Sequence, residues 1–188
     1  MSEVIGYILT GGKNRRMDGK IKFFLEYQGS CFGERVAAAL EGCKEIYLSV
    51  NERGPYEDLG LPLVLDEYEA IGPMGGILSG MRNLPGKDLL VVSSDMPFLE
   101  KAVIEKLMEV YLENPVLTIC QAEGRLYPFP GIYPGGLLPL LEKLAAEGTY
   151  RMGSIRELTD YQTVTVPKSF LQNINSWEEY KILTDAER

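Results

Sequence analysis

The sequence contains no histidine among its 188 residues and only three cysteines, at positions 31, 43 and 120. The absence of histidine excludes mechanisms that need an imidazole base or an imidazole metal ligand. The cysteines are far apart and form no CxxC pair, so neither a disulfide framework nor a thiolate zinc site is indicated. Any chemistry must therefore use carboxylates, lysine, arginine, asparagine, backbone groups or a metal ion held by oxygen.

Positive charge and long apolar runs are also scarce. Lys and Arg number 19 against 27 Asp and Glu, which gives a formal net charge of -8. We expect no nucleic-acid partner, because binding a polyanion needs a basic surface. No apolar run approaches the ~20 residues that span a bilayer, and the apolar stretch 4–9 is too short for a signal peptide. These absences predict a cytoplasmic protein without a membrane partner.

Strand-like and helix-like patterns alternate over the first 112 residues. The predicted strands are 4–10, 45–50, 61–65 and 88–93. The predicted helices are 30–40, 75–84 and 101–112. This alternation is typical of βαβ units and predicts a mostly parallel sheet covered on both faces.

The rest of the chain is less regular. Its predicted elements are a hairpin of strands 116–122 and 126–133, a helix 136–146, a loop 148–153, a strand 161–166 and a helix 176–184. Ser176 is the expected N-cap of the last helix, with Glu179 as its capping-box partner. We therefore expect one three-layer α/β domain spanning residues 1–188, with one antiparallel strand in its second half.

Four of the predicted strands end at glycine or polar residues. In open α/β sheets, ligands bind beyond the carboxyl ends of the strands. The residues at these ends are Gly11-Gly12, Asn51, Asp66 and Asp95. We expect them to converge on one crevice.

The first of these loops, residues 9–22 (LTGGKNRRMDGKIK), combines glycine with positive charge. Five of the chain's 19 basic residues fall within positions 13–22. Glycines let backbone N–H groups approach phosphate oxygens, and basic side chains supply the charge that a triphosphate needs. A tight turn followed by a solvated basic stretch explains the residues equally well. The segment is neither a Walker A loop nor a GxGxxG motif.

Two further segments are consistent with a nucleotide site. In 71–80 (IGPMGGILSG) a Gly-Pro turn leads into a helix whose first N–H groups are free to bind a ligand. Alone, this segment favours an ordinary helix start with a glycine-rich packing face. Asp95 follows a buried strand and is the best candidate ligand for Mg²⁺, which prefers one or two carboxylates together with phosphate oxygens. A capping role for Asp95 at the helix that begins near Glu100 is comparably consistent.

Taken in order, these motifs resemble those of the MobA-type molybdenum cofactor guanylyltransferases over nearly the whole chain. The residues that match the family signature L-A-G-G-x-S-x-R-M-G-x-x-D-K are Leu9, Gly11, Gly12, Arg16, Met17, Gly19 and Lys22. Segment 71–80 is similar to the family's G-P-L-x-G loop. The residues that match the family motif C-D-x-P-[FY]-[LI] are Asp95, Pro97, Phe98 and Leu99. Segment 173–180 resembles the family's closing N-x-N-[ST]-x-E motif.

The resemblance implies a Rossmann-like fold of the nucleotide-diphospho-sugar-transferase type. It implies transfer of GMP from GTP to the phosphate of molybdopterin, with Mg²⁺ and release of pyrophosphate. The implied catalytic residues are Arg16, Lys22 and Asp95, of which Asp95 is the metal ligand. The implied nucleotide-binding residues are Leu9, Thr10, Gly11, Gly12, Lys22, Asn51, Asp66, Gly72, Pro73 and Gly75. Asn173 and Asn175 would bind the acceptor or complete the metal environment.

Three alternatives remain open. The same chemistry with CTP or a sugar-phosphate acceptor is one, although the Gly-Pro-Met-Gly-Gly loop and the Arg16-Met17 pair favour the guanylyl branch. A catalytically silent nucleotide-binding module is another, because Ile21 stands where the family carries Asp. The third is an adaptor that delivers the cofactor to apo-enzymes. The family resemblance is also compatible with transient contact with cofactor-synthesis or acceptor proteins.

Overall fold

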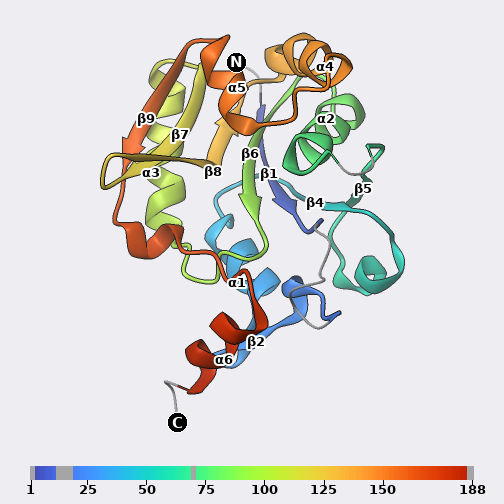
Figure 1. Cartoon of the computed structure of the whole chain (residues 1–188), viewed down its shortest axis with the longest axis vertical. Coiled ribbons are helices and arrows are strands. Elements are labelled where there is room, and N and C mark those ends of the chain that lie inside the picture. Colours follow the sequence, from blue (N-terminus) through green and yellow to red (C-terminus); the bar gives the residue numbers. More distant parts are fainter. Residues whose placement is uncertain (1–2, 12–18, 69–70, 186–188) are drawn as a thin grey trace.

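The computed structural model describes residues 3–11, 19–68 and 71–185. A seven-stranded sheet forms its centre, with strand order β5-β4-β1-β6-β8-β7-β9 (Figure 1). The strands are β1 (Glu3–Leu9), β4 (Ile46–Val50), β5 (Leu63–Leu65), β6 (Lys87–Ser93), β7 (Leu117–Ala122), β8 (Arg125–Tyr133) and β9 (Tyr161–Thr165). The helices are α1 (Phe32–Ala39), α2 (Pro73–Asn83), α3 (Lys101–Glu113), α4 (Leu138–Ala146), α5 (Met152–Glu157) and α6 (Trp177–Asp185).

The sheet is mostly parallel, as the alternation of strands and helices predicts. Strand β1 pairs in parallel with β4 and β6, and β4 pairs in parallel with β5. Strand β8 runs antiparallel to both of its neighbours, β6 and β7, and β7 pairs in parallel with β9. The carboxyl ends of β1, β4, β5 and β6 therefore lie along one edge of the sheet.

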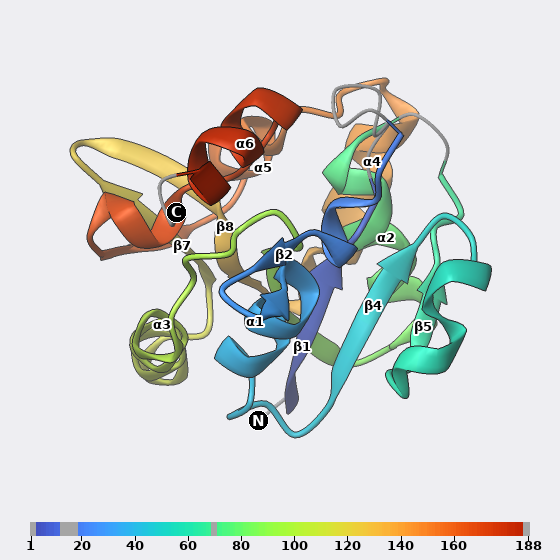
Figure 2. The same ribbon diagram turned by 90° about the horizontal axis from the view of Figure 1, so that it is seen from below.

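Helices cover both faces of the sheet, which gives three layers (Figure 2). On one face, α1 and α3 bury side chains such as Val36 and Leu107 against the strands. On the other face, α2, α4 and α5 bury side chains such as Ile77, Leu141 and Ile155. Alternate residues of β1 enter the two cores because successive side chains of a strand point to opposite faces. No helix in the described parts of the chain is both long and apolar enough to cross a membrane.

The differences from the sequence-based expectations lie in short elements. Residues 148–153 are not all loop, because α5 begins at Met152. The helix expected over 136–146 starts as a 3₁₀ turn, and its α-helical part begins at Leu138. The helix expected from residue 30 begins at Phe32, because residues 30–31 form β3 of a small hairpin with β2 (Glu26–Tyr27). Its turn has positive φ at both Gln28 and Gly29, the geometry of a tight hairpin.

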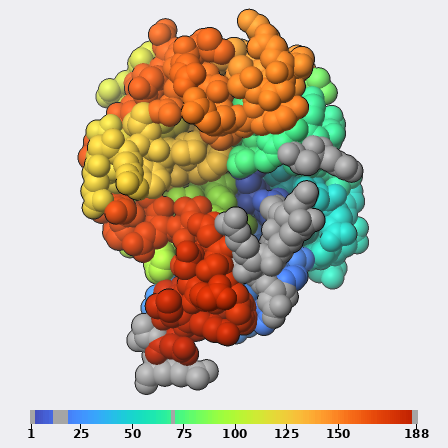
Figure 3. Space-filling view, viewed as in Figure 1, coloured from blue at the N-terminus to red at the C-terminus, as the bar shows by residue number. Residues whose placement is uncertain are grey.

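The last helix packs against this hairpin. Figures 1 and 3 show α6 at one end of the molecule, beside the hairpin strands. Leu25, Phe32 and Ile174 form a small buried cluster there, and the Tyr180 hydroxyl donates to the Glu26 carbonyl at 2.8 Å. This packing brings the C-terminal segment back to the carboxyl edge of β1 and β6.

The predicted capping box of α6 is half formed. The Ser176 hydroxyl accepts a hydrogen bond from the Glu179 N–H at 3.2 Å, as a capping box requires. The Glu179 carboxylate, however, accepts from the N–H of Asn175 at 2.6 Å rather than from that of Ser176. Glu179 therefore fixes the backbone of Asn175, one residue before the cap.

Candidate active site

The strand ends meet where the sequence places the candidate residues. The Ser94 N–H donates to the Leu9 carbonyl at 3.0 Å, which joins the ends of β6 and β1. The Asp66 N–H donates to the Val50 carbonyl at 2.9 Å, which joins the ends of β5 and β4. Figure 3 shows the surface hollowed at this edge, with atoms of β1 at the bottom of the hollow. Two predicted site residues, Gly12 and Arg16, lie outside the described residues.

Asp95 is held by three side chains and one backbone contact. Its Oδ1 accepts from the Ser93 hydroxyl and from the Asn173 amide, both at 2.7 Å. Its Oδ2 forms an ion pair with the Lys22 Nζ at 2.7 Å. Its carbonyl accepts from the N–H of Ile174 at 2.9 Å. The alternative that Asp95 caps the following helix is wrong, because the N-cap of α3 is Glu100 and it makes no side-chain cap.

Lys22 reaches Asp95 from a 3₁₀ turn over Lys22–Phe24. Its Nζ also donates to the Asn175 Oδ1 at 3.1 Å, so the ammonium lies between two segments that are distant in sequence. The next residue, Phe23, is buried against Gly33 of α1, where an added Cβ would lie 2.2 Å from the ring. The side chains of Lys22 and Asp95 are only 19% and 11% exposed. This packing fixes Lys22 beside Asp95.

The first glycine turn lies next to Asn51. A Cβ added to Gly11 would lie 3.4 Å from the Asn51 Oδ1. The Thr10 hydroxyl donates to the Ser49 carbonyl at 2.6 Å, and the Leu9 side chain is buried in the core. Thr10 and Leu9 therefore present backbone rather than side-chain groups to the edge. Burial raises the pKa of Tyr56, and its hydrogen bond with Thr10 opposes that shift.

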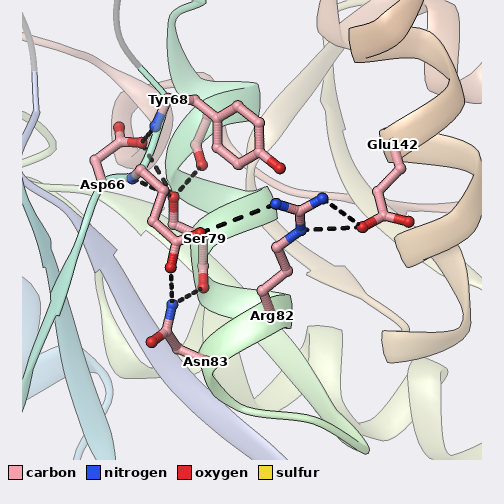
Figure 4. Close-up of polar contacts among 8 residues, drawn as sticks. Asp66, Tyr68, Ser79, Arg82, Asn83 and Glu142 are labelled. Carbon is pink, nitrogen blue, oxygen red and sulfur yellow. Dashed lines mark hydrogen bonds and ion pairs between the residues drawn. The ribbon is translucent and has the colours of Figure 1, made fainter.

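Asp66 is tied to helix α2 (Figure 4). Its Oδ1 accepts from the Tyr68 N–H at 3.0 Å and lies 3.1 Å from the Ser79 hydroxyl. Ser79 is fully buried, accepts from the Glu67 N–H at 2.9 Å and lies 2.9 Å from the Gly75 carbonyl. These contacts fix the end of β5 on the first turns of α2.

The same region reaches α4 through an arginine. The Arg82 guanidinium lies over the Tyr68 ring, 5.2 Å from its centroid, and donates to the Glu142 carboxylate at 2.8 Å (Figure 4). These three residues help to line a half-open pocket of about 280 Å³ between α2 and α4. Neither Lys22 nor Asp95 contributes to that pocket.

The glycines at the start of α2 allow it to lie close to the sheet. Gly72 is the N-cap, with φ 68° and ψ -153°, a conformation that favours glycine, and Pro73 follows at the first helical position. A Cβ on Gly75 would lie 3.0 Å from the Ile71 side chain, and one on Gly76 would lie 2.7 Å from the Leu9 side chain. The helix N-terminus lies at the same edge. Its first N–H groups are not all free as the sequence predicts, because Pro73 has none and the Gly75 N–H donates to the Gly72 carbonyl at 3.0 Å.

The arrangement suits a cation that arrives with its own ligands. The described residues hold no group of three or more Cys, Asp or Glu side chains that could enclose a metal ion. Mg²⁺ is usually held by one or two carboxylates, with phosphate and water oxygens completing its six ligands. Asp95 can supply one such carboxylate. Its Oδ2 already contacts one cation, the Lys22 ammonium, so a positive charge is accommodated at this oxygen.

Some of the residues that build this site carried no sequence signal. Ser93 ends strand β6 and contacts Asp95, and Ser79 lies within helix α2 and contacts Asp66. The sequence around each serine does not indicate its contact. Lys20 lies over the Trp177 ring, with its Nζ 4.2 Å from the centroid. That contact joins residues from opposite ends of the chain, which no local pattern reveals.

The fold is shared with solved nucleotidyltransferase structures. The molybdopterin-guanine dinucleotide biosynthesis protein A from Archaeoglobus fulgidus matches with a TM-score of 0.77 and 20% identity, covering 96% of this chain and 97% of that one. The 4-diphosphocytidyl-2C-methyl-D-erythritolsynthase from Anaerococcus prevotii matches with a TM-score of 0.74 and 13% identity, covering 100% and 99%. The predicted fold class is confirmed.

Two curated relatives are similar in sequence. The molybdenum cofactor biosynthesis bifunctional protein of Synechocystis is 32% identical over 183 residues, covering 93% of this chain. The chain spans about half the length of that relative (52%). A probable molybdenum cofactor guanylyltransferase of Clostridium perfringens (strain ATCC 13124) is 37% identical over 136 residues, covering 72% of this chain and 68% of the relative.

The fold and the sequence likeness together place the chain in the class of nucleotidyltransferases. The chain belongs to the family of the MobA-like NTP transferase domain, whose sequence model matches residues 6–164. The family resemblance seen in the motifs is thereby confirmed. Asn173, Asn175 and α6 lie beyond the matched residues, although Asn173 contacts Asp95 directly.

Proposed function

We propose that the protein transfers GMP from GTP to the phosphate of molybdopterin and releases pyrophosphate. The observation that carries this proposal is the Lys22–Asp95 pair, which lies beside the first glycine turn at the shared edge of β1 and β6. A lysine for phosphate and a carboxylate for a metal ion are the two charges that a metal-bound triphosphate needs. The names of the curated relatives support guanylyl transfer to the molybdenum cofactor.

In this reaction the bonds change at the α-phosphorus of GTP. An oxygen of the acceptor phosphate forms a bond to that phosphorus, and the bond to the α–β bridging oxygen breaks. Pyrophosphate leaves with the electron pair. No general base is needed because the acceptor phosphate is already ionised. Catalysis then depends on alignment and on neutralising the charge of the triphosphate.

Different residues of the chain would bind the phosphates, the metal ion and the nucleoside. Lys22 and Arg16 would bind phosphate oxygens, with backbone N–H groups of Gly11 and Gly12 beside them. Asp95 would hold Mg²⁺, which supplies positive charge to the phosphates and the leaving group. Leu9 and Thr10 would contact the nucleotide through their backbones.

The nucleoside would lie toward β4, β5 and α2. Asn51 and Asp66 end the two strands there, and the α2 N-terminus carries Gly72, Pro73 and Gly75. Asn173 and Asn175 contact the Lys22–Asp95 pair from the segment between β9 and α6. Their contacts with that pair favour the metal environment over direct binding of the pterin.

A ligand panel followed by a transfer assay tests this function. Thermal unfolding is measured with GTP, CTP, ATP and UTP, each with Mg²⁺. We expect GTP to stabilise the protein, by about 2.7 kcal/mol at a hundredfold excess over Kd. Molybdopterin is then added and pyrophosphate release is measured. Stabilisation by CTP instead would indicate a cytidylyltransferase, and GTP binding without pyrophosphate release would indicate a silent nucleotide-binding module.

A further inference from the structure

The two oxygens of the Asp95 carboxylate are engaged differently. Oδ1 accepts two uncharged donors, the Ser93 hydroxyl and the Asn173 amide. Oδ2 contacts the charged Nζ of Lys22. Two donors match the two lone pairs of Oδ1, so rotation of the carboxylate would disturb both hydrogen bonds.

Lys22 therefore occupies the oxygen that remains for a cation. Its ammonium is tethered and close, with a second contact to Asn175 at 3.1 Å. Oδ2 has one acceptor position left, and a metal ion bound there would lie beside the ammonium in a site where both side chains are mostly buried. A metal ion and an ammonium at one carboxylate oxygen repel each other strongly in such a site.

We propose that Oδ2 of Asp95 is the metal-binding oxygen and that Lys22 holds its place until a metal-bound triphosphate takes the ammonium away. In the exchange, the Lys22 ammonium would leave Oδ2 of Asp95 for a phosphate oxygen, and Oδ2 would then be free to hold the metal ion. Ser93 and Asn173 are then positioning residues, because they hold the carboxylate through Oδ1. The inference rests on the proposed function in taking a metal-bound triphosphate as the ligand.

A consequence is that metal and triphosphate bind together. The triphosphate supplies the negative charge that receives Lys22, and the metal supplies the positive charge that replaces it. Each ligand therefore raises the affinity for the other, and the metal alone binds weakly.

Mn²⁺ binding in the absence of nucleotide tests this exchange by titration calorimetry. Lys22→Met is expected to bind Mn²⁺ at least ~10-fold more tightly than wild type, because the competing ammonium is gone. Lys22→Arg keeps a cation beside Oδ2 and is expected to bind Mn²⁺ as weakly as wild type. Adding Asp95→Asn to Lys22→Met is expected to abolish the gain. Equal affinity of Lys22→Met and wild type would overturn the proposal.

The positioning role has its own readout. In the Lys22→Met background, Asn173→Ala and Ser93→Ala are expected to weaken Mn²⁺ binding several-fold at an unchanged unfolding midpoint. Asn173→Gln, which can still donate an amide hydrogen bond, is expected to restore part of the affinity. A loss of Mn²⁺ affinity that only follows a loss of stability would show that these two residues are merely structural.

A wild-type structure keeps the test independent of whether the variants fold. With Mn²⁺ and a non-hydrolysable GTP analogue, we expect Asp95 Oδ2 on the metal and the Lys22 Nζ on a phosphate oxygen. An intact Lys22–Asp95 pair in that complex would refute the exchange. If the wild type does not transfer GMP but Lys22→Met binds Mn²⁺ more tightly, only the proposed function is refuted. If the wild type transfers GMP but Lys22→Met binds Mn²⁺ no more tightly, only the exchange is refuted.

An independent observation assigns a positioning role to Ser79. Its buried hydroxyl contacts the Glu67 N–H, the Asp66 carboxylate and the Gly75 carbonyl. We infer that Ser79 holds Asp66 in the orientation in which it contacts the nucleoside, an inference that also rests on the proposed function. The Gly75 contact is the usual bond of a helical serine to its own helix, whereas the Glu67 and Asp66 contacts reach residues outside α2.

Ser79→Ala is expected to raise the KM for GTP by about tenfold with little change in kcat, since lost ground-state binding raises KM alone. Ser154→Ala is the matched control, because Ser154 is a buried helical serine on α5, away from Asp66. Ser79→Cys, which keeps a weak donor, is expected to lie between Ser79→Ala and wild type. An unchanged KM in Ser79→Ala, or the same rise in Ser154→Ala, would contradict this role.

Discussion

Asp95 and Asp66 both follow parallel strands at one edge of the sheet, but they are held in different ways. The partners of Asp66 are local, at 2 and 13 residues along the chain. Asp95 has one local partner, Ser93, but Lys22 and Asn173 are 73 and 78 residues away from it. Asp66 is therefore positioned within one strand–helix unit, whereas Asp95 depends on the 3₁₀ turn at Lys22 and on the C-terminal segment. Changes in those two distant segments should affect Asp95 and leave Asp66 in place.

The largest effect that separates the two aspartates is expected from Asp95→Asn. Loss of the metal ligand should lower turnover with Mg²⁺ by at least ~1000-fold, the size seen when a major electrostatic contribution is removed. Asp66→Asn is the comparison variant and should mainly raise the KM for GTP. Pyrophosphate release at saturating GTP measures both. Activity of Asp95→Asn close to wild type in Mg²⁺ would show that Asp95 is not the metal ligand.

Lys22→Ala should weaken binding of the metal-bound triphosphate by ~10- to 100-fold, because a charge-assisted hydrogen bond to phosphate is lost. The free energy of unfolding should fall by less than about 1 kcal/mol, which is below the ~1.4–2.7 kcal/mol that this loss of binding represents. Calorimetric titration with a GTP analogue and denaturant unfolding give the two values. If the loss of stability equals the loss of binding energy, Lys22 has a structural role.

Gly33→Ala tests the packing that holds Lys22 in place. The added methyl group would lie 2.2 Å from the Phe23 ring, so the ring and the adjoining 3₁₀ turn must shift. We expect a stability loss of about 1–3 kcal/mol, typical of overpacking, and weaker triphosphate binding. Gly136→Ala, where the methyl group meets no atom within 4 Å, is the control. Unchanged triphosphate affinity in Gly33→Ala would show that Lys22 does not depend on Phe23.

The smallest effect is expected at the amino end of β1, far from both aspartates. Hydrogen bonds from Lys44 and then Lys87 lower the pKa of Glu3 from 4.5 to about 2. Its contribution to stability is therefore present above pH 4.5 and is lost as the pH falls toward 2. Wild type should lose more stability than Glu3→Gln between those pH values, as measured by denaturant unfolding. Both proteins should bind GTP equally at neutral pH, and a difference there would mean that Glu3 influences the site.

The parts of the site that follow from local patterns could be predicted. Asp66 and Asp95 each follow a clear apolar strand, and the parallel pairing that brings strand ends together follows from the βαβ alternation. The Gly72-Pro73 start of α2 also follows from residue type, since positive φ and a first-position proline are local preferences. Their nucleotide-binding roles remain predictions.

The remaining contacts depend on tertiary packing. The family resemblance implies a role for Asn173 at the acceptor or the metal ion, but no local pattern in 173–175 indicates that its amide donates to Asp95. The position of that segment is set by the packing of α6 on the β2–β3 hairpin. That hairpin was missed because its strands have only two residues each. The capping box predicts that the Glu179 carboxylate accepts from the Ser176 N–H, but it accepts from the Asn175 N–H. The path of the chain before α6 decides between these two N–H groups, and no local pattern fixes that path.

The contact between Lys20 and Trp177 also has a practical use. Trp177 is the chain's one tryptophan, and its indole ring lies under an ammonium two residues from Lys22. Indole emission responds to nearby charge, so movement of Lys20 relative to α6 would change the intrinsic fluorescence of the protein. The wild-type chain therefore carries its own optical probe beside the crevice, and ligand titrations can be followed without a label.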